Sequence, residues 1–118
     1  MARAPRYSSQ ICKKFQTAMD LLGKRWTGLI VNALQEGPLR FNQVSERMEV
    51  IGDRMLSERL KELEEAGIVE RSVLSQPVLR VEYALTGKGR GLGKVLASIS
   101  RWADEWVEAP AEKRKASR

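Results

Sequence analysis

The sequence of 118 residues contains one cysteine, Cys12, and no histidine. A lone cysteine cannot form a disulfide within the chain, and zinc sites of the Cys/His type are excluded. The absence of histidine also excludes a Ser-His-Asp triad and acid–base catalysis by an imidazole. Since the acidic residues show no pattern that would assemble a polar catalytic pocket, we expect no enzymatic activity, no metal and no cofactor.

Cys12 is followed directly by Lys13 and Lys14. Neighbouring cations and a helix N-terminus favour the thiolate, which is the form of cysteine that reacts with oxidants and electrophiles. Oxidation of this thiol would end in a sulfenic acid, a mixed disulfide or a bond between two chains. A quinone or an aldehyde could alkylate it instead, and a neighbouring lysine could join an aldehyde adduct. The alternative is a small structural side chain that is buried near Phe15, since free cysteines are commonly buried.

The charged residues are distributed unevenly along the chain. Residues 1–25 carry a net charge of +5, residues 26–70 a net of −4 and residues 71–118 a net of +5. The total of +6 favours an acidic partner such as nucleic acid. Because the centre of the chain is acidic, the fold would have to assemble a nucleic-acid surface from selected basic residues.

Four segments in the first part of the chain have apolar residues at helical spacing. Gly23, Gly37-Pro38 and Gly67 stand where three of these segments stop, as glycine and proline do at helix ends. Leu39-Arg40-Phe41 is expected to be a short extended link. The predicted helices are residues 11–22, 26–34, 41–48 and 53–66.

The spacing of apolar residues changes after the fourth helix. Apolar and polar residues alternate in segments 68–75 and 79–85, which predicts a β-hairpin with its turn at residues 75–78. Thr86 is a suitable N-cap for a last long helix, and the glycine-rich run at residues 87–91 predicts that this helix starts late. The fold class is therefore mainly α with a small β-hairpin, in the order α-α-α-α-β-β-α.

The chain is expected to form a single domain over residues 11–108. Residues 1–10 are predicted to be a flexible basic arm, and residues 109–118 a disordered basic tail. The N-terminal residues lack the apolar core of a signal peptide, and the longest apolar runs are far shorter than the ~20 residues of a membrane span. These features predict a cytoplasmic protein without a membrane partner.

A short helix, a turn that contains Gly52, a longer helix and a hairpin form the order of a winged helix-turn-helix. At 100° per residue, Leu56, Leu60 and Leu63 lie on one face of the longer helix and define its core side. The first half of such a helix usually meets base edges in the major groove of DNA. Four polar residues lie away from the core side and are predicted to contact double-stranded DNA: Arg54, Ser57, Glu58 and Lys61.

Three further arginines lie where a winged fold approaches the DNA backbone or the minor groove. Arg40 precedes the third helix, and Arg71 and Arg80 lie on the hairpin, with Arg80 beside its tip. We predict that they bind phosphates or enter the minor groove. The alternative is that these arginines, and the polar residues of the longer helix, belong to ordinary solvated surfaces.

Both terminal helices carry apolar stripes that a domain of this size cannot easily bury within itself. We therefore predict a homodimer through the terminal helices, with two reading helices that meet half-sites of a palindromic operator about one DNA turn apart. The predicted interface residues are Ile11, Phe15, Leu96, Ile99, Trp102 and Trp106.

Several spaced motifs resemble the HxlR-type transcription regulators: Gly23-Lys24-Arg25-Trp26-Thr27, residues 37–41, residues 55–64, Gly67-Ile68-Val69 and residues 80–86. The resemblance extends from Cys12 to about Trp106. It implies a homodimeric bacterial winged-helix protein, related in shape to MarR regulators. Many members carry a sensing cysteine near the N-terminus, and Cys12 matches that position. One departure is Gly52, where the family often has a serine or threonine cap.

The motifs and the resemblance together predict a sequence-specific regulator of transcription that binds double-stranded DNA. We expect a repressor that senses oxidants or electrophiles, such as quinones and aldehydes, through Cys12. The alternative is a winged-helix module that binds protein or RNA, with a structural Cys12. Such a module would not discriminate between duplex DNA sequences.

Overall fold

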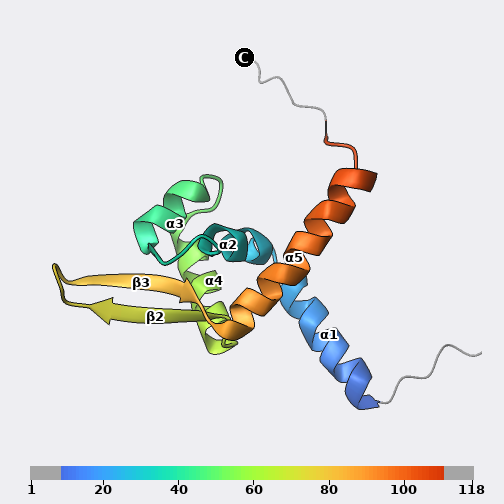
Figure 1. Ribbon diagram of the computed structural model, residues 1–118, viewed down its shortest axis with the longest axis horizontal. Coiled ribbons are helices and arrows are strands. Elements are labelled where there is room, and N and C mark those ends of the chain that lie inside the picture. Colours follow the sequence, from blue (N-terminus) through green and yellow to red (C-terminus); the bar gives the residue numbers. More distant parts are fainter. Residues whose placement is uncertain (1–8, 111–118) are drawn as a thin grey trace, which may run out of the picture.

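The computed structural model describes residues 9–110 of the chain (Figure 1). The predicted basic tail from residue 111 onward, most of the predicted N-terminal arm and the side chain of Ile11 lie outside the described residues. The first helix begins at Ser9, within the segment predicted as an arm. The elements are α1 (Ser9–Gly23), α2 (Thr27–Leu34), β1 (Leu39–Arg40), α3 (Phe41–Arg47), α4 (Asp53–Glu65), β2 (Val69–Leu74), β3 (Arg80–Leu85) and α5 (Gly87–Trp106).

The core forms where α2, α3 and α4 pack together against the base of the sheet and the first half of α5. The apolar stripes predicted for α2, α3 and α4 all contribute buried side chains to it. Helix α1 contributes little, because only Leu21 and Leu22 among its described side chains are even partly buried. The buried apolar residues are Ile30, Val31, Leu34, Val44, Met48, Ile51, Leu56, Leu60, Leu63, Ile68, Val69, Leu85 and Leu96.

The sheet has three strands, where the sequence predicted a two-stranded hairpin. Strands β2 and β3 pair in the expected antiparallel way, with Val69 opposite Leu85 and Val73 opposite Val81. The segment predicted as an extended link is a third strand, β1, which pairs with β3 and places Leu39 opposite Tyr83. Two residues are too few to show an alternating pattern, so only pairing with a distant strand defines β1.

The last helix starts directly after Thr86, and the prediction of a late start is wrong. The hydroxyl of Thr86 accepts a hydrogen bond from the Gly89 amide at 3.1 Å, so Thr86 is the expected N-cap. A Cβ at Gly89 would collide with the carbonyl oxygen of Ile68. A Cβ at Gly93 would lie 2.9 Å from Oε1 of Gln35. The glycines thus allow close packing of α5 on the body and do not prevent the helix from forming.

This packing predicts opposite effects for two neighbouring glycines. Gly89→Ala is expected to lower the free energy of unfolding by about 2 kcal/mol or more, because the backbone of Ile68 cannot move aside easily. Gly91→Ala is not expected to lower it, since a Cβ there meets no atom within 4 Å and alanine favours a helix by about 1 kcal/mol. Urea unfolding of both variants at equal chain concentration measures the difference. Equal destabilisation would contradict the close contact at Gly89.

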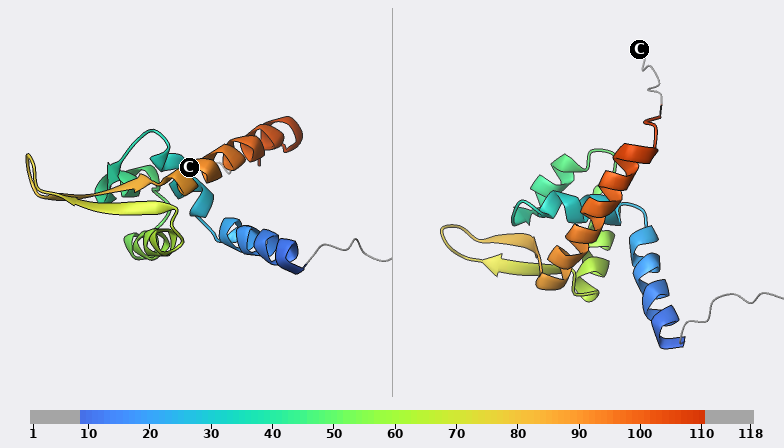
Figure 2. Two further views of the ribbon diagram at one scale, coloured as in Figure 1. Left: turned by 60° about the horizontal axis from the view of Figure 1, so that its bottom comes forward. Right: turned by 45° about the vertical axis from the view of Figure 1, so that its right-hand side comes forward.

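Helices α1 and α5 extend from the body on the side opposite to the β2–β3 hairpin (Figures 1 and 2). The hairpin projects in the other direction, beyond α4. Within residues 9–110, no helix has the length and apolar character needed to cross a membrane. The molecule therefore presents two extended features, a pair of terminal helices at one end and a wing at the other.

Candidate nucleic-acid interface

Helix α4 has the orientation that its sequence predicts. Leu56, Leu60 and Leu63 are fully buried, which fixes one side of the helix against the core. The four residues predicted to contact DNA are exposed on the remaining surface: Arg54, Ser57, Glu58 and Lys61. The structure therefore places these side chains together on one element, with the first three in its N-terminal half.

The start of α4 lacks a side-chain cap, as the glycine at position 52 implies. Asp53 lies in the first turn instead, and its Oδ1 accepts a hydrogen bond from Ser45 Oγ of α3 at 2.8 Å. A carboxylate in the first turn interacts favourably with the helix dipole. The same contact joins α3 to α4, so a specific hydrogen bond helps to fix the angle between the two helices of the helix-turn-helix.

A second connection, not predicted from the sequence, holds α4 to the chain between α1 and α2. Arg59 Nε donates to the carbonyl oxygen of Arg25 at 2.7 Å, and its Nη1 lies 3.0 Å from Glu62 Oε1. Lys24 Nζ lies 3.4 Å from the same carboxylate oxygen. These groups lie on the flank of α4 that does not carry Arg54, so they fix the rotation of the helix while leaving its polar face free.

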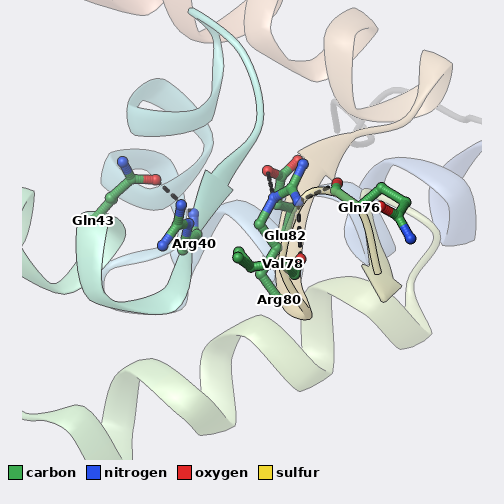
Figure 3. Close-up of polar contacts among 6 residues, drawn as sticks. All are labelled: Arg40, Gln43, Gln76, Val78, Arg80 and Glu82. Atoms are coloured by element: carbon green, nitrogen blue, oxygen red, sulfur yellow. Dashed lines mark hydrogen bonds and ion pairs between the residues drawn. The ribbon is translucent and has the colours of Figure 1, made fainter. Parts of the chain in front are cut away.

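Arg40 lies at the junction between β1 and α3, where it is the N-cap residue. Its backbone N–H donates to Gln43 Oε1 at 2.8 Å (Figure 3). Its side chain is exposed, and β1 pairing sets Arg40 opposite Glu82 of β3. The junction therefore holds an exposed arginine between the start of α3 and the base of the wing.

The two arginines of the wing have different environments. Arg71 is exposed on β2, opposite Tyr83. Arg80 turns back on the wing, and its side chain is only 20% exposed. Its Nε donates to Glu82 Oε2 at 2.9 Å, and its Nη1 donates to the carbonyl oxygens of Gln76 and Val78 at 2.6 and 3.1 Å (Figure 3). Arg80 therefore braces the turn, and a direct contact of Arg80 with DNA stays a prediction.

Cys12 is exposed near the start of α1, so in the single chain it is not the buried structural residue of the alternative interpretation. Lys13 and Lys14 are also exposed. Both line a groove of about 1040 Å³ between α1, the end of α4 and α5. The apolar part of the groove comes from Ala18, Leu21, Ile68, Leu92 and Val95. The groove thus has an apolar floor and lysines on its α1 side, whereas Cys12 does not line it and lies on the face of α1 that carries Phe15 and Met19.

Most of the residues predicted for a dimer interface are exposed in the single chain. Phe15 of α1 is 64% exposed, and Trp102 and Trp106 of α5 are 60% and 69% exposed. Ile99 belongs to the same exposed stripe, together with Val95.

Leu96 does not belong to the exposed stripe, contrary to its prediction as an interface residue, because it is 8% exposed and belongs to the core. At 100° per residue, the stripe from Val95 to Trp106 stays within about 40° of one direction, whereas Leu96 lies about 100° away from Val95. That rotation turns Leu96 toward α2, where its Cδ2 would lie 3.7 Å from a Cβ built at Gly28. Val95 replaces Leu96 on the exposed stripe.

Comparison with known proteins agrees with this geometry. Residues 21–111 match the model of the HxlR-like helix-turn-helix family. The chain is 47% identical to the HTH-type transcriptional regulator YodB of Bacillus subtilis, over 83% of this chain and 88% of YodB. The structure of reduced YodB superposes with a TM-score of 0.77 at 46% identity, covering 85% of this chain and 98% of YodB. That of quinone-bound YodB superposes with a TM-score of 0.72 at 47% identity, covering 80% and 99%.

The match spans the helix-turn-helix, the wing and α5, and it covers nearly all of YodB as well as most of this chain. The chain belongs to the HxlR-like helix-turn-helix family of DNA-binding transcriptional regulators.

Proposed function

We propose that this regulator is a cytoplasmic, homodimeric repressor that binds a palindromic duplex and responds to oxidants or electrophiles at Cys12. The observation that carries the DNA-binding part is the polar face of α4. Its side chains are exposed while three leucines and the Arg59 contacts hold the helix in place. A rigid helix with free polar side chains in its first half is what base reading in the major groove requires.

The proposed DNA contacts divide by chemistry. Arg54 and Glu58 read base edges, since an arginine binds guanine and a glutamate accepts from cytosine N4, and Ser57 adds an adaptable hydrogen bond. Three cations farther from the centre of the reading face bind phosphates and position the helix: Arg40, Lys61 and Arg71. Arg80 shapes the wing through the hydrogen bonds described above.

Dimer formation is supported by the terminal helices. Phe15, Met19, Val95, Ile99, Trp102 and Trp106 leave large apolar surfaces in water, and surfaces of this kind commonly mark an interface. The groove beside α1 can receive the partner's α5, because its apolar floor of Ala18, Leu21 and Leu92 matches the apolar stripe of that helix. A two-fold axis would repeat the contact and place two copies of α4 on one side.

Selection of duplexes from a random library by the full chain tests the DNA-binding proposal. The expected product is an inverted repeat whose half-sites lie about 10 base pairs apart, centre to centre. Footprinting of the selected duplex should show protection that is symmetric about the centre of the repeat. A protein- or RNA-binding module would enrich no duplex sequence.

The sensing proposal rests on the exposed thiol and on the relative, YodB, whose structures include a reduced and a quinone-bound form. The Cys12 thiolate can add to a ring carbon of a quinone to form a C–S bond, and the ring then takes up a proton and becomes a hydroquinone thioether. With a hydroperoxide, the thiolate attacks the terminal oxygen, the O–O bond breaks, and a sulfenic acid forms with release of an alcohol. Both reactions change the size and polarity of an exposed group on the face of α1 that carries Phe15 of the proposed dimer interface.

Replacing Cys12 by serine is expected to separate binding from sensing. The variant should bind the selected duplex with an affinity within about twofold of wild type, because position 12 lies on α1 at the end of the molecule opposite the wing. Benzoquinone should weaken binding by the wild type at least about tenfold and leave the variant unchanged. Anisotropy titrations measure the affinities, and intact-mass spectra report one adduct per wild-type chain. Equal responses of the two proteins to benzoquinone would contradict a sensing role.

A further inference from the structure

The chain between α1 and α2 contains a strained backbone conformation. Trp26, the N-cap residue of α2, has a φ of 80° and lies in the left-handed region. Within residues 9–110 it is the one residue other than glycine with a positive φ. A tryptophan is unfavourable in this region because its Cβ comes too close to the backbone. The contacts around Trp26 must therefore hold it in this conformation.

The peptide group between Arg25 and Trp26 is bound directly to the reading helix. Arg59 Nε of α4 donates to the Arg25 carbonyl oxygen at 2.7 Å. The orientation of this carbonyl depends on the φ of Trp26, because both belong to one peptide group. The Arg25 guanidinium lies 4.5 Å from the centroid of the Trp26 ring, and the ring packs against the core. Rotation of Trp26 to a negative φ would turn the carbonyl away from Arg59 and break the bond to α4.

This peptide group also lies at the end of α1 that contacts the body. Helix α1 is one unbroken helix of 15 residues that leaves the body (Figure 2). Among its described side chains, only Leu21 and Leu22 in its last turns are partly buried. A continuous helix is stiff, so a displacement of α1 near Cys12 would be passed along it to residues 24–26, where the chain turns into α2.

We propose that the Arg25–Trp26 peptide group is a two-state switch through which α1 controls the reading helix, with Arg59 as the positioning residue. This inference rests on the proposed function, because it supplies the connection from Cys12 to DNA. In the first state, which the structure shows, Trp26 is left-handed and Arg59 is bound. In the second state Trp26 has a negative φ, Arg59 is released, and α4 loses a bond that fixes its rotation.

The two states are opposed by different interactions. Relief of the backbone strain at Trp26 favours the second state, and the hydrogen bond from Arg59 favours the first. A displacement of α1 that disfavours the left-handed turn therefore shifts the equilibrium toward the second state. DNA affinity then falls, since base reading requires the polar face of α4 to be held in one orientation.

Arg59→Ala tests the switch, with Arg47→Ala as the matched control. Arg47 of α3 also donates to a backbone carbonyl oxygen of α2, that of Ala33 at 3.4 Å, and also pairs with a glutamate, Glu36. It binds the end of α2 that is farther from α1. The buried leucines of α4 remain in both variants, and circular dichroism checks that both are folded.

The probe that displaces α1 is N-phenylmaleimide, whose double bond adds the Cys12 thiol to form a bulky thioether. Labelling should weaken binding of the selected duplex at least about tenfold in wild type and in Arg47→Ala, and less than about twofold in Arg59→Ala. Unlabelled Arg59→Ala should already bind about as weakly as the labelled wild type. Intact-mass spectra show that all three proteins are fully labelled. A merely structural role of Arg59 would lower the affinity and leave the response to labelling intact.

Hydrogen exchange gives a second readout that needs no DNA. Amides of residues 24–30 should exchange faster in the labelled wild type than in the unlabelled one, and equally fast in both forms of Arg59→Ala. Unchanged exchange on labelling of the wild type would overturn the switch. So would an equal loss of affinity in the labelled wild type and labelled Arg59→Ala, which would indicate that the label acts on the dimer contact instead.

Failure of the proposed function has a different signature. If the wild type prefers no duplex, DNA reading is excluded, and the exchange data alone decide for or against the switch. If N-phenylmaleimide weakens binding and benzoquinone does not, sensing of quinones is excluded and the switch is supported.

Discussion

Replacing Arg54 by alanine is expected to weaken binding of the selected duplex by about 100-fold or more. A bidentate contact between an arginine and a guanine contributes about 1–3 kcal/mol of discrimination. Each dimer would carry two copies of the contact, so the substitution removes its contribution to the binding free energy twice. Arg54 is exposed in the first turn of α4 and holds no other element in place, so the variant should remain folded.

Lys61→Ala is the matched control on the same helix, because Lys61 is proposed to bind phosphate and not a base. Its loss should weaken binding to the selected and to the scrambled duplex by the same factor. It should also reduce the slope of log affinity against log salt by about one per chain. Arg54→Ala should instead lower the affinity for the selected duplex far more than for the scrambled one. A variant at Arg54 that keeps the wild-type preference would show that α4 does not read bases through this residue.

Replacing Trp102 by aspartate is expected to convert the dimer into a monomer. The side chain is 60% exposed in the single chain, so the substitution should cost little stability within one chain. In the proposed interface it would bury an unpaired carboxylate, which is strongly unfavourable. A monomer reads one half-site only, so affinity for the inverted repeat should fall at least about 100-fold.

Sedimentation velocity at micromolar concentration measures the oligomeric state, and anisotropy with the selected duplex measures the affinity. Lys94→Asp serves as the control, since it places the same new carboxylate on an exposed part of α5 off the apolar stripe. The control should remain a dimer. Dimeric Trp102→Asp with wild-type affinity would exclude α5 from the interface.

The sequence predicts most of the fold because the helices depend on periodic burial. The faces of α4 follow from the spacing of Leu56, Leu60 and Leu63 alone, and the structure confirms them. Strand β1 could not be predicted, since a two-residue strand exists only through its pairing with β3. The start of α5 directly after Thr86 could not be predicted either. The glycines serve the close approach of Gly89 to the Ile68 backbone, which is a tertiary contact.

The candidate site was predictable to a similar degree. Exposure of Arg54 follows from helical periodicity, whereas the environments of Arg80 and Leu96 depend on contacts between elements. The sequence does place Glu82 two residues after Arg80, which in a strand puts both side chains on one face. That spacing is compatible with an ion pair, but the capture of Arg80 by the loop carbonyls requires the folded turn.

The most direct test of the account is the affinity of the full chain for the selected duplex and for a scrambled duplex of equal length, measured across a salt series. A dimer that reads bases through α4 should prefer the selected duplex by about 1,000-fold or more at physiological salt. Both affinities should fall as salt rises, because both include phosphate contacts. A preference near one at every salt concentration would show charge-driven binding alone and would contradict the central claim that the polar face of α4 reads DNA sequence.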